Sequence, residues 1–202
     1  MSRYTGPRVR VLRALNTDLP GLTRKGVKRR EGRPGQHGYA RRRRPSEYAL
    51  QLREKQIVRH NYGVTERQLR RLFDRAKRAI GVTGNQMLAM LESRLDNVVF
   101  RAGFAATIPG ARQLVNHGHV TVNGRRVDIA SAELRVGDTV GLRPRSQRHP
   151  GVAECWPSPA LPLPPWLERD ESAKTARLVD RPTIASVAVD VDMQLVVEFY
   201  SR

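Results

Sequence analysis

The order of apolar and polar residues predicts a run of helices between residues 46 and 118. Three sets of apolar side chains recur at the spacing of one buried helical stripe: Leu69, Leu72, Phe73, Ala76 and Ile80; Leu88, Leu91, Leu95 and Val98; and Ala111, Leu114 and Val115. The second stripe can continue through a bend into residues 96–102. With the helical pattern that starts at residue 46, these stripes predict four helices.

Capping residues set the expected limits of these helices. Candidate N-caps are Ser46, Thr65, Thr83 and Thr107, and candidate C-terminal stops are Gly63, Gly103 and Gly118. Gln68 and Gln86 each stand three residues after a threonine, which is the spacing of a capping box. Pro109 falls in the first turn of the last helix, where proline is tolerated.

Beyond residue 119 the pattern changes to short strands. Asn123-Gly124 separates two β-type runs and is a strong hairpin signal, because both turn residues take positive φ. Val136-Gly137-Asp138 predicts another turn, followed by a strand over residues 139–142. Two helices and a small antiparallel sheet are therefore expected over residues 92–143. The apolar run at residues 194–200 predicts a buried strand.

Two segments lack an apolar period. Residues 1–45 hold few large apolar side chains and many Gly, Pro and Arg, so they bury too little surface to fold alone. We expect them to be extended or irregular and to order fully only against a partner; a basic tail of no particular shape is the alternative. Residues 144–165 are rich in proline and predict a linker or an irregular wrap.

The charge of the chain indicates the kind of partner. The chain holds 37 Lys+Arg against 19 Asp+Glu, a net charge of +18, and 32 of the basic residues are Arg. Residues 1–80 carry 23 Lys+Arg and 6 Asp+Glu, so most of the excess lies there. Such an excess favours a polyanionic partner. Because Arg bonds phosphate bidentately and stacks on bases, the bias predicts a structured nucleic-acid contact.

Several classes of protein and site are excluded by the same residues. The single Cys155 excludes a disulfide framework and a cysteine-based zinc site. No apolar stretch approaches the ~18 residues of a membrane span, and the start has no apolar signal core. We expect a reducing, cytosol-like compartment, no cofactor, no metal and no small-molecule substrate. His117 and His119 lack a nearby Cys or acid pair, so we expect them to face RNA or to end a helix rather than to bind a metal. Asp96 is expected to be the charge partner of a nearby Arg.

A set of motifs, taken in order, is similar to the small-subunit ribosomal protein four family over almost the whole chain. The matching segments are Ser2-Arg3-Tyr4-Thr5-Gly6-Pro7-Arg8-Val9-Arg10, Gly35-Gln36-His37-Gly38, Leu52-Arg53-Glu54-Lys55-Gln56, Glu92-Ser93-Arg94-Leu95-Asp96-Asn97-Val98-Val99, Ala111-Arg112-Gln113-Leu114-Val115-Asn116-His117-Gly118-His119-Val120, Val122-Asn123-Gly124-Arg125 and Glu198-Phe199-Tyr200-Ser201-Arg202. Pro20-Gly21-Leu22-Thr23 and Thr107-Ile108-Pro109-Gly110 resemble the cyanobacterial and plastid branch. The chain resembles the zinc-free variants, because it lacks the four N-terminal cysteines of many relatives.

The resemblance implies an α+β fold in four parts. These are an extended basic N-terminal segment over residues 1–45, a helical domain over 46–91 joined by 180–202, an RNA-binding domain of two helices and a small antiparallel sheet over 92–152, and a Pro-rich irregular wrap over 153–179.

The resemblance also implies a function. It implies a structural, non-enzymatic protein that binds the 5′ domain of 16S rRNA, nucleates assembly of the 30S subunit, and supports translational accuracy with ribosomal protein five. Other small-subunit proteins, and mRNA where it enters the subunit, are further expected partners. The expected location is the ribosome, in the cytoplasm or, for a plastid-encoded protein, in the plastid stroma.

The candidate rRNA-binding residues are basic, polar or aromatic residues of the matched segments and of the basic helix faces. They are Arg3, Tyr4, Arg8, Arg10, Arg13, Gln36, His37, Arg41, Arg42, Arg43, Arg44, Arg53, Lys55, Gln56, Arg59, Arg67, Arg70, Arg71, Arg94, Arg112, Gln113, Asn116, His117, His119, Asn123, Arg125 and Arg126.

Two other functions use similar residues. An RNA-modifying enzyme can carry the same RNA-binding domain, but only about 50 residues follow it here, with no clustered acid, base or nucleophile. A general nucleic-acid-binding or DNA-binding protein is the other alternative, although no helix-turn-helix or basic-zipper pattern is present.

Overall fold

The computed structural model describes residues 4–25, 32–38 and 44–202 of the chain. The candidate residues Arg3, Arg41, Arg42 and Arg43 lie outside this part. The chain divides into two compact units: residues 1–87 with 189–202, and residues 88–188. Helix α4 (Thr83–Glu92) contains the division. The fold is mixed α+β, as predicted. No helix in the described ranges is long and apolar enough to cross a membrane.

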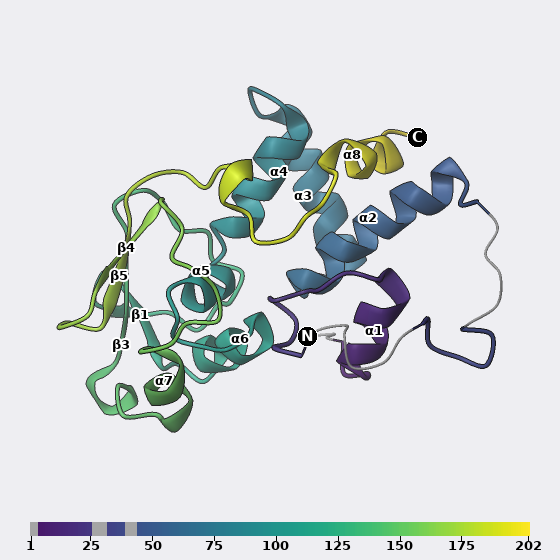
Figure 1. The fold of residues 1–202 in the computed structure, drawn as a ribbon. Coiled ribbons are helices and arrows are strands. Elements are labelled where there is room, and N and C mark those ends of the chain that lie inside the picture. Colours follow the sequence, from purple (N-terminus) through teal and green to yellow (C-terminus); the bar gives the residue numbers. More distant parts are fainter. Residues whose placement is uncertain (1–3, 26–31, 39–43) are drawn as a thin grey trace. The chain divides into compact units, whose positions relative to one another are not determined.

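The first unit is helical. Its helices are α1 (Arg8–Leu15), α2 (Glu47–Asn61), α3 (Glu66–Arg78), the first half of α4, and α8 (Met193–Ser201). Helix α8 packs along α2 and also contacts α3 (Figure 1). Gly84 allows α4 to approach α8 closely, because a Cβ there would lie 3.0 Å from the Cβ of Met193. The buried side chains include Leu12, Leu19, Ile57, Tyr62, Leu69, Phe73, Met87 and Val196.

The capping signals of this unit are mostly confirmed. Ser46 caps α2 by accepting a hydrogen bond from the Ala49 amide, and Gly63 follows the helix with φ of 59°. Thr65 and Gln68 form the reciprocal capping box of α3. Residues Leu69, Leu72, Phe73 and Ala76 form the buried stripe that their spacing predicts.

Two details at the end of α3 differ from the prediction. Ile80 is 97% exposed, because α3 ends at Arg78 and the extended Ala79 turns the chain away. Thr83 is the first residue of α4 rather than its cap, and the side-chain Nε2 of Gln86 donates to the Ile80 carbonyl at 2.9 Å. The capping box predicted for Thr83 is therefore wrong, since Gln86 is used to close the loop.

The basic N-terminal segment is more ordered than its composition predicts. Residues 8–15 form helix α1, which buries Val11 and Leu12, and the following turn buries Leu19 and Leu22. The amide of Gly21 donates to the side chain of Asn61 in α2 at 3.0 Å. The expectation of an extended or irregular segment is wrong for residues 8–22, because these four apolar side chains pack into the helical unit.

The C-terminal segment is a helix, not the predicted strand. Asp192 accepts hydrogen bonds from the amides of Gln194 and Leu195 and so caps α8. Met193 and Val196, three residues apart, are buried on one side, which is a helical period. Packing on α2 and this cap outweigh the strand preference of the Val-Val run.

The second unit combines helices with a small sheet. Helices α5 (Leu95–Arg101) and α6 (Ile108–Asn116) are followed by strands β1 (Val120–Val122), β2 (Arg125–Arg126) and β3 (Thr139–Leu142). Thr107 caps α6, Pro109 lies in its first turn, and Asn123 and Gly124 take the predicted positive φ values of 50° and 77°. A short 3-10 turn η2 (Pro144–Ser146), helix α7 (Pro150–Cys155) and a later turn η3 (Ile184–Ser186) complete the helical elements.

Two further strands enlarge the sheet. Strands β4 (Leu167–Asp170) and β5 (Thr175–Leu178) form a hairpin, and β5 pairs with β3. The antiparallel sheet has five strands in the order β2-β1-β3-β5-β4. The irregular wrap expected over residues 153–179 is therefore wrong for residues 167–178. Ala176 and Leu178 form the buried face of β5, but two alternating residues are too few to predict a strand from the sequence.

Candidate nucleic-acid interface

Two arginines of the candidate set converge on one buried carboxylate in the second unit. Asp96 is fully buried and accepts two hydrogen bonds from Arg94, at 3.0 and 2.8 Å. It also accepts two from Arg112 of α6, at 3.0 and 2.6 Å. The prediction that Asp96 is the partner of a nearby arginine is confirmed. A carboxylate as deeply buried as Asp96 requires such pairing.

The two arginines differ in what they present to solvent. The side chain of Arg94 is 8% exposed and that of Arg112 is 20% exposed. We therefore assign Arg94 to positioning, because its buried guanidinium donates from both Nε and Nη2 to the Asp96 carboxylate. Arg112 is held at the surface of α6 by the same carboxylate. Its place at an RNA interface remains a prediction.

Several candidate cations of the first unit bind carbonyl or hydroxyl groups of the N-terminal segment. Arg53 of α2 donates to the Leu15 carbonyl at 3.0 Å and to the Thr17 hydroxyl at 2.9 Å. Arg8 donates to the Leu22 carbonyl at 3.3 Å. These bonds tie α1 and the turn after it to one another and to α2. They explain how a strongly basic segment keeps a defined shape.

Lys55 of α2 is also an internal cation. Its side chain is 8% exposed, its Nζ lies 3.1 Å from the Glu66 carboxylate, and it lies 4.4 Å from the centre of the Phe199 ring. Arg59 lies farther from the same carboxylate, at 4.0 Å, with a side chain that is 31% exposed. Lys55 therefore joins α2, α3 and α8, and sequence alone did not separate it from its exposed neighbours.

Helix α3 carries a dense set of exposed basic groups in the first unit. Arg67, Arg70 and Arg71 are exposed, opposite the stripe that packs into the core. The later residues Arg75, Lys77 and Arg78 extend this exposed set. Other exposed candidates are Tyr4, Arg8, Arg10, Gln36, His37 and Arg44, whereas Arg13 and Gln56 are half-buried. Tyr4 lies edge-on to His60, with ring centres 5.3 Å apart.

The exposed candidates of the second unit gather at the end of α6 and on the β1–β2 hairpin. Gln113, Asn116 and His117 are exposed along and after α6. Asn123, Arg125 and Arg126 are exposed on the hairpin. Gly118, with φ of 71°, lies between the two groups, and a Cβ there would collide with the guanidinium of Arg126. The glycine that follows α6 thus lets the guanidinium of Arg126 lie against the backbone at residue 118.

The pKa values of two histidines, His60 and His119, are lowered. Burial, and next the charge of Arg59, lower the pKa of His60 to about 4. Burial, and next the nearby His149, His117 and Arg143, lower the pKa of His119. Both rings are therefore neutral near pH 7. Within the described ranges no three His, Cys, Asp or Glu side chains are placed to hold a metal ion.

Sequence reasoning missed a further set of exposed groups after β3. Arg143, Arg145, Arg148 and His149 are exposed in a short stretch of the second unit. Three arginines within six residues were a usable signal, but the prolines around them favoured reading the stretch as a linker. The Arg143 amide donates to the His119 carbonyl at 2.9 Å, so the stretch lies beside the end of α6.

Comparison with known proteins gives matches along most of the chain. Residues 3–92 match the family described as ribosomal protein S4/S9 N-terminal domain, and residues 93–140 match the S4 domain. The β4–β5 hairpin and α8 lie beyond both matches.

Full-length relatives carry one common name. The small ribosomal subunit protein uS4 of Synechococcus elongatus (strain PCC 7942) is 54% identical over 203 residues, and that of Prochlorococcus marinus (strain MIT 9303) is 52% identical. The protein of the same name from Methylobacillus flagellatus is 48% identical. Each alignment covers 100% of this chain and 99% of the relative.

Proposed function

This chain belongs to the small ribosomal subunit protein uS4 family, and from that premise we propose that it binds 16S rRNA directly and early in assembly of the subunit. As a uS4 protein it is a structural component of the small ribosomal subunit and carries an RNA-binding S4 domain. We further propose that its site is the 5′ domain of 16S rRNA and that its binding nucleates assembly of the 30S subunit.

This proposal is supported mainly by the arginines, which fall into two groups: one is bonded within the protein and the other is exposed. One group, including Arg53 and Arg94, bonds to the protein itself and fixes local shape. Another group, including Arg67, Arg71 and Arg126, is exposed. Exposed guanidinium groups on an ordered frame can match the phosphates of a folded RNA, whereas a floppy cationic tail would not select one shape.

The proposed mechanism is electrostatic and geometric, with no bond made or broken. Arg and Lys displace counterions condensed on the RNA, and this release supplies affinity. Selectivity comes from the shape of an RNA junction and from contacts to 2′-hydroxyl groups, because the A-form major groove is too narrow to admit a helix. The net charge of +18 makes the counterion contribution large.

The finer partners are also part of the proposal. We propose that ribosomal protein five lies beside this protein, that the pair supports translational accuracy, and that mRNA enters the subunit nearby. The protein acts on the ribosome, in the cytoplasm or in a plastid stroma. The enzyme alternative is not favoured, because the full-length relatives are named as ribosomal proteins.

A salt-titrated footprint of the purified chain on 16S rRNA tests this function. We expect protection confined to one junction of the 5′ domain. If about six to ten phosphates are engaged, raising salt from 50 to 200 mM weakens binding by about three to five orders of magnitude. Duplex DNA at equal salt is the control. Equal affinity for DNA, or protection spread over all helices of the RNA, would contradict the proposal.

A further inference from the structure

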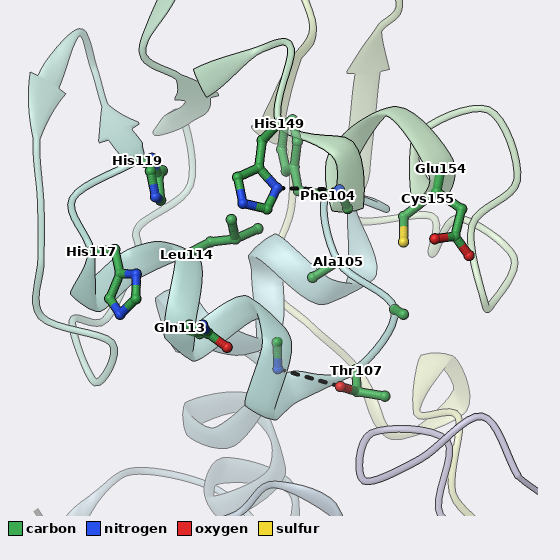
Figure 2. A pocket seen from close by; sticks show the side chains of 13 residues that line it. Phe104, Ala105, Thr107, Gln113, Leu114, His117, His119, His149, Glu154 and Cys155 are labelled. Carbon is green, nitrogen blue, oxygen red and sulfur yellow. Dashed lines mark hydrogen bonds between the residues drawn. The ribbon is translucent and has the colours of Figure 1, made fainter. Parts of the chain in front are cut away.

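A pocket of about 240 Å³ lies in the second unit between α6, the loop before it and α7. Figure 2 shows its walls. Its apolar lining comes from Phe104, Ala105, Leu114 and Cys155. At roughly 30 Å³ per liquid water, this volume equals about eight waters. It is therefore room enough for one planar heterocycle.

Three histidine rings line one side of this pocket. The ring centres of His117 and His119 are 6.1 Å apart, and those of His119 and His149 are 5.5 Å apart. Nδ1 of His119 shares a hydrogen bond of 2.9 Å with the Ser146 hydroxyl, and Nδ1 of His149 accepts one from the Gly151 amide at 3.2 Å. Among the described residues, no partner bonds Nε2 of either ring.

The surroundings of the pocket are cationic, although its interior is not. The guanidinium of Arg126 lies against Gly118, the residue that separates His117 from His119 in the sequence. Arg143 is close enough to His119 to contribute to the lowered pKa of that ring. Arg145 and Arg148 are exposed on the same short stretch as His149. Glu154, an exposed residue of α7, also lines the pocket and adds a negative charge that would repel a phosphate.

We propose that this pocket receives one unstacked nucleobase of the bound RNA, while the arginines around it hold the flanking phosphates. The inference rests on the proposed rRNA-binding function. An apolar lining with aromatic rings at one side suits the two faces of a base, and RNA-binding proteins commonly stack unpaired bases on such rings. An imidazole Nε2 can bond a base edge as a donor or as an acceptor. A bare phosphate would leave the apolar lining unused and would meet Glu154.

Gly110 offers a way to fill the pocket without breaking the fold. It lines the pocket in α6, and an added Cβ would meet the Thr107 hydroxyl at 3.5 Å and the Ala105 Cβ at 3.8 Å, which are ordinary contacts. Gly110→Leu therefore projects a side chain into the pocket, and Gly110→Ala is the matched control. Gly151→Leu fills it from α7, where an added Cβ would lie 3.4 Å from the His149 ring.

The test compares base and backbone protection of 16S rRNA by the full chain. Wild type and Gly110→Ala should protect one unpaired base from dimethyl sulfate or carbodiimide. Both leucine variants should expose that base, keep the surrounding hydroxyl-radical protection, and weaken binding about tenfold or more, the size of one lost stacking contact. Tryptophan fluorescence checks folding, because Trp156 and Trp166 both lie in this unit.

The outcomes separate this inference from the function on which it rests. If both leucine variants keep the base protection and the affinity of the wild type, the pocket does not bind a base, and the proposed rRNA binding still stands. Failure of the wild type to bind 16S rRNA would overturn both. Binding of adenosine or uridine monophosphate to the wild type and to the leucine variants gives a second measurement. If the free nucleotide binds the wild type and not the leucine variants, while base protection of rRNA is unchanged, the occupant is a free nucleotide and the proposal is wrong.

Discussion

The phenol of Tyr200 donates a 2.7 Å hydrogen bond to the carboxylate of Glu66. The two residues are 134 positions apart, and the bond joins α8 to the start of α3. Burial raises the pKa of Glu66, but the Tyr200 bond and the Lys55 cation outweigh it, so the pKa lies below its usual value. Burial and the same bond raise the pKa of Tyr200. The charged Glu66 and the neutral Tyr200 therefore favour each other.

We expect Tyr200→Phe to reduce the stability of the first unit by about 1–2 kcal/mol, because it removes a hydrogen bond to a charged group that is partly solvated. Hydrogen exchange of α2 and α8 amides measures this loss. As pH rises above about 10, the unfolded wild type releases the tyrosine proton first, so the difference between wild type and variant should shrink. A difference that grows with pH would contradict this account.

Asp96→Asn should destabilise the second unit by about 3–5 kcal/mol, because it leaves Arg94 buried without an anion. Denaturant unfolding followed by tryptophan fluorescence reports on this unit alone, since both tryptophans lie in it. Asp138→Asn is the matched control. Asp138 bonds the Asn123 side chain and the Arg135 amide at the surface, and we expect a cost below about 1 kcal/mol. Equal costs would contradict a central role for Asp96.

Acid should weaken the first unit through His60. Its folded-state pKa is about 4, against 6.5 for an ordinary histidine. The unfolded chain therefore binds more protons between these values, and stability falls as pH drops from 7 toward 4. Because the ring is only partly buried, we expect the loss attributable to His60 to be on the order of 1 kcal/mol. Hydrogen exchange of α2 in wild type and His60→Gln measures it. Parallel pH dependence in the two proteins would rule it out.

Arg71 and Lys55 should differ in their effect on rRNA binding. Arg71 is exposed on α3, whereas Lys55 is buried against Glu66 and Phe199. Arg71→Gln should reduce the slope of log affinity against log salt by about 1, the loss of one phosphate contact. Lys55→Gln should leave that slope unchanged and lower the stability of the first unit. The reverse pattern would show that burial does not separate the two roles. Filter binding at several salt concentrations makes the comparison.

Local signals in the sequence predicted the elements that local physics determines. Thr65 with Gln68, and Asn123 with Gly124, bond or turn within four residues, so their patterns hold in any fold. The stripe from Leu69 to Ala76 was also predictable, because one face of a helix must be buried. Ile80 continued that spacing, yet the chain had already turned at Ala79.

Features that depend on distant partners could not be predicted in this way. Helix α8 is capped by Asp192 and packs on α2. The β4–β5 hairpin is added to the sheet because β5 pairs with β3. The roles of the basic residues could not be predicted for the same reason. A count of charges does not distinguish Arg94 from Arg71. Only the position of Asp96 shows that the first is used inside the protein.

The attachment of α8 to the first unit has a consequence for biosynthesis. The amide of Asp192 donates to Glu54, and Gln51 donates to Glu198, so the first unit is closed by a segment that is translated after the whole second unit. Until residues 189–202 have been translated, α2 lacks this cover. A transcript truncated before codon 189 would yield a product with an apolar flank open to chaperones and proteases, even though its second unit could be complete.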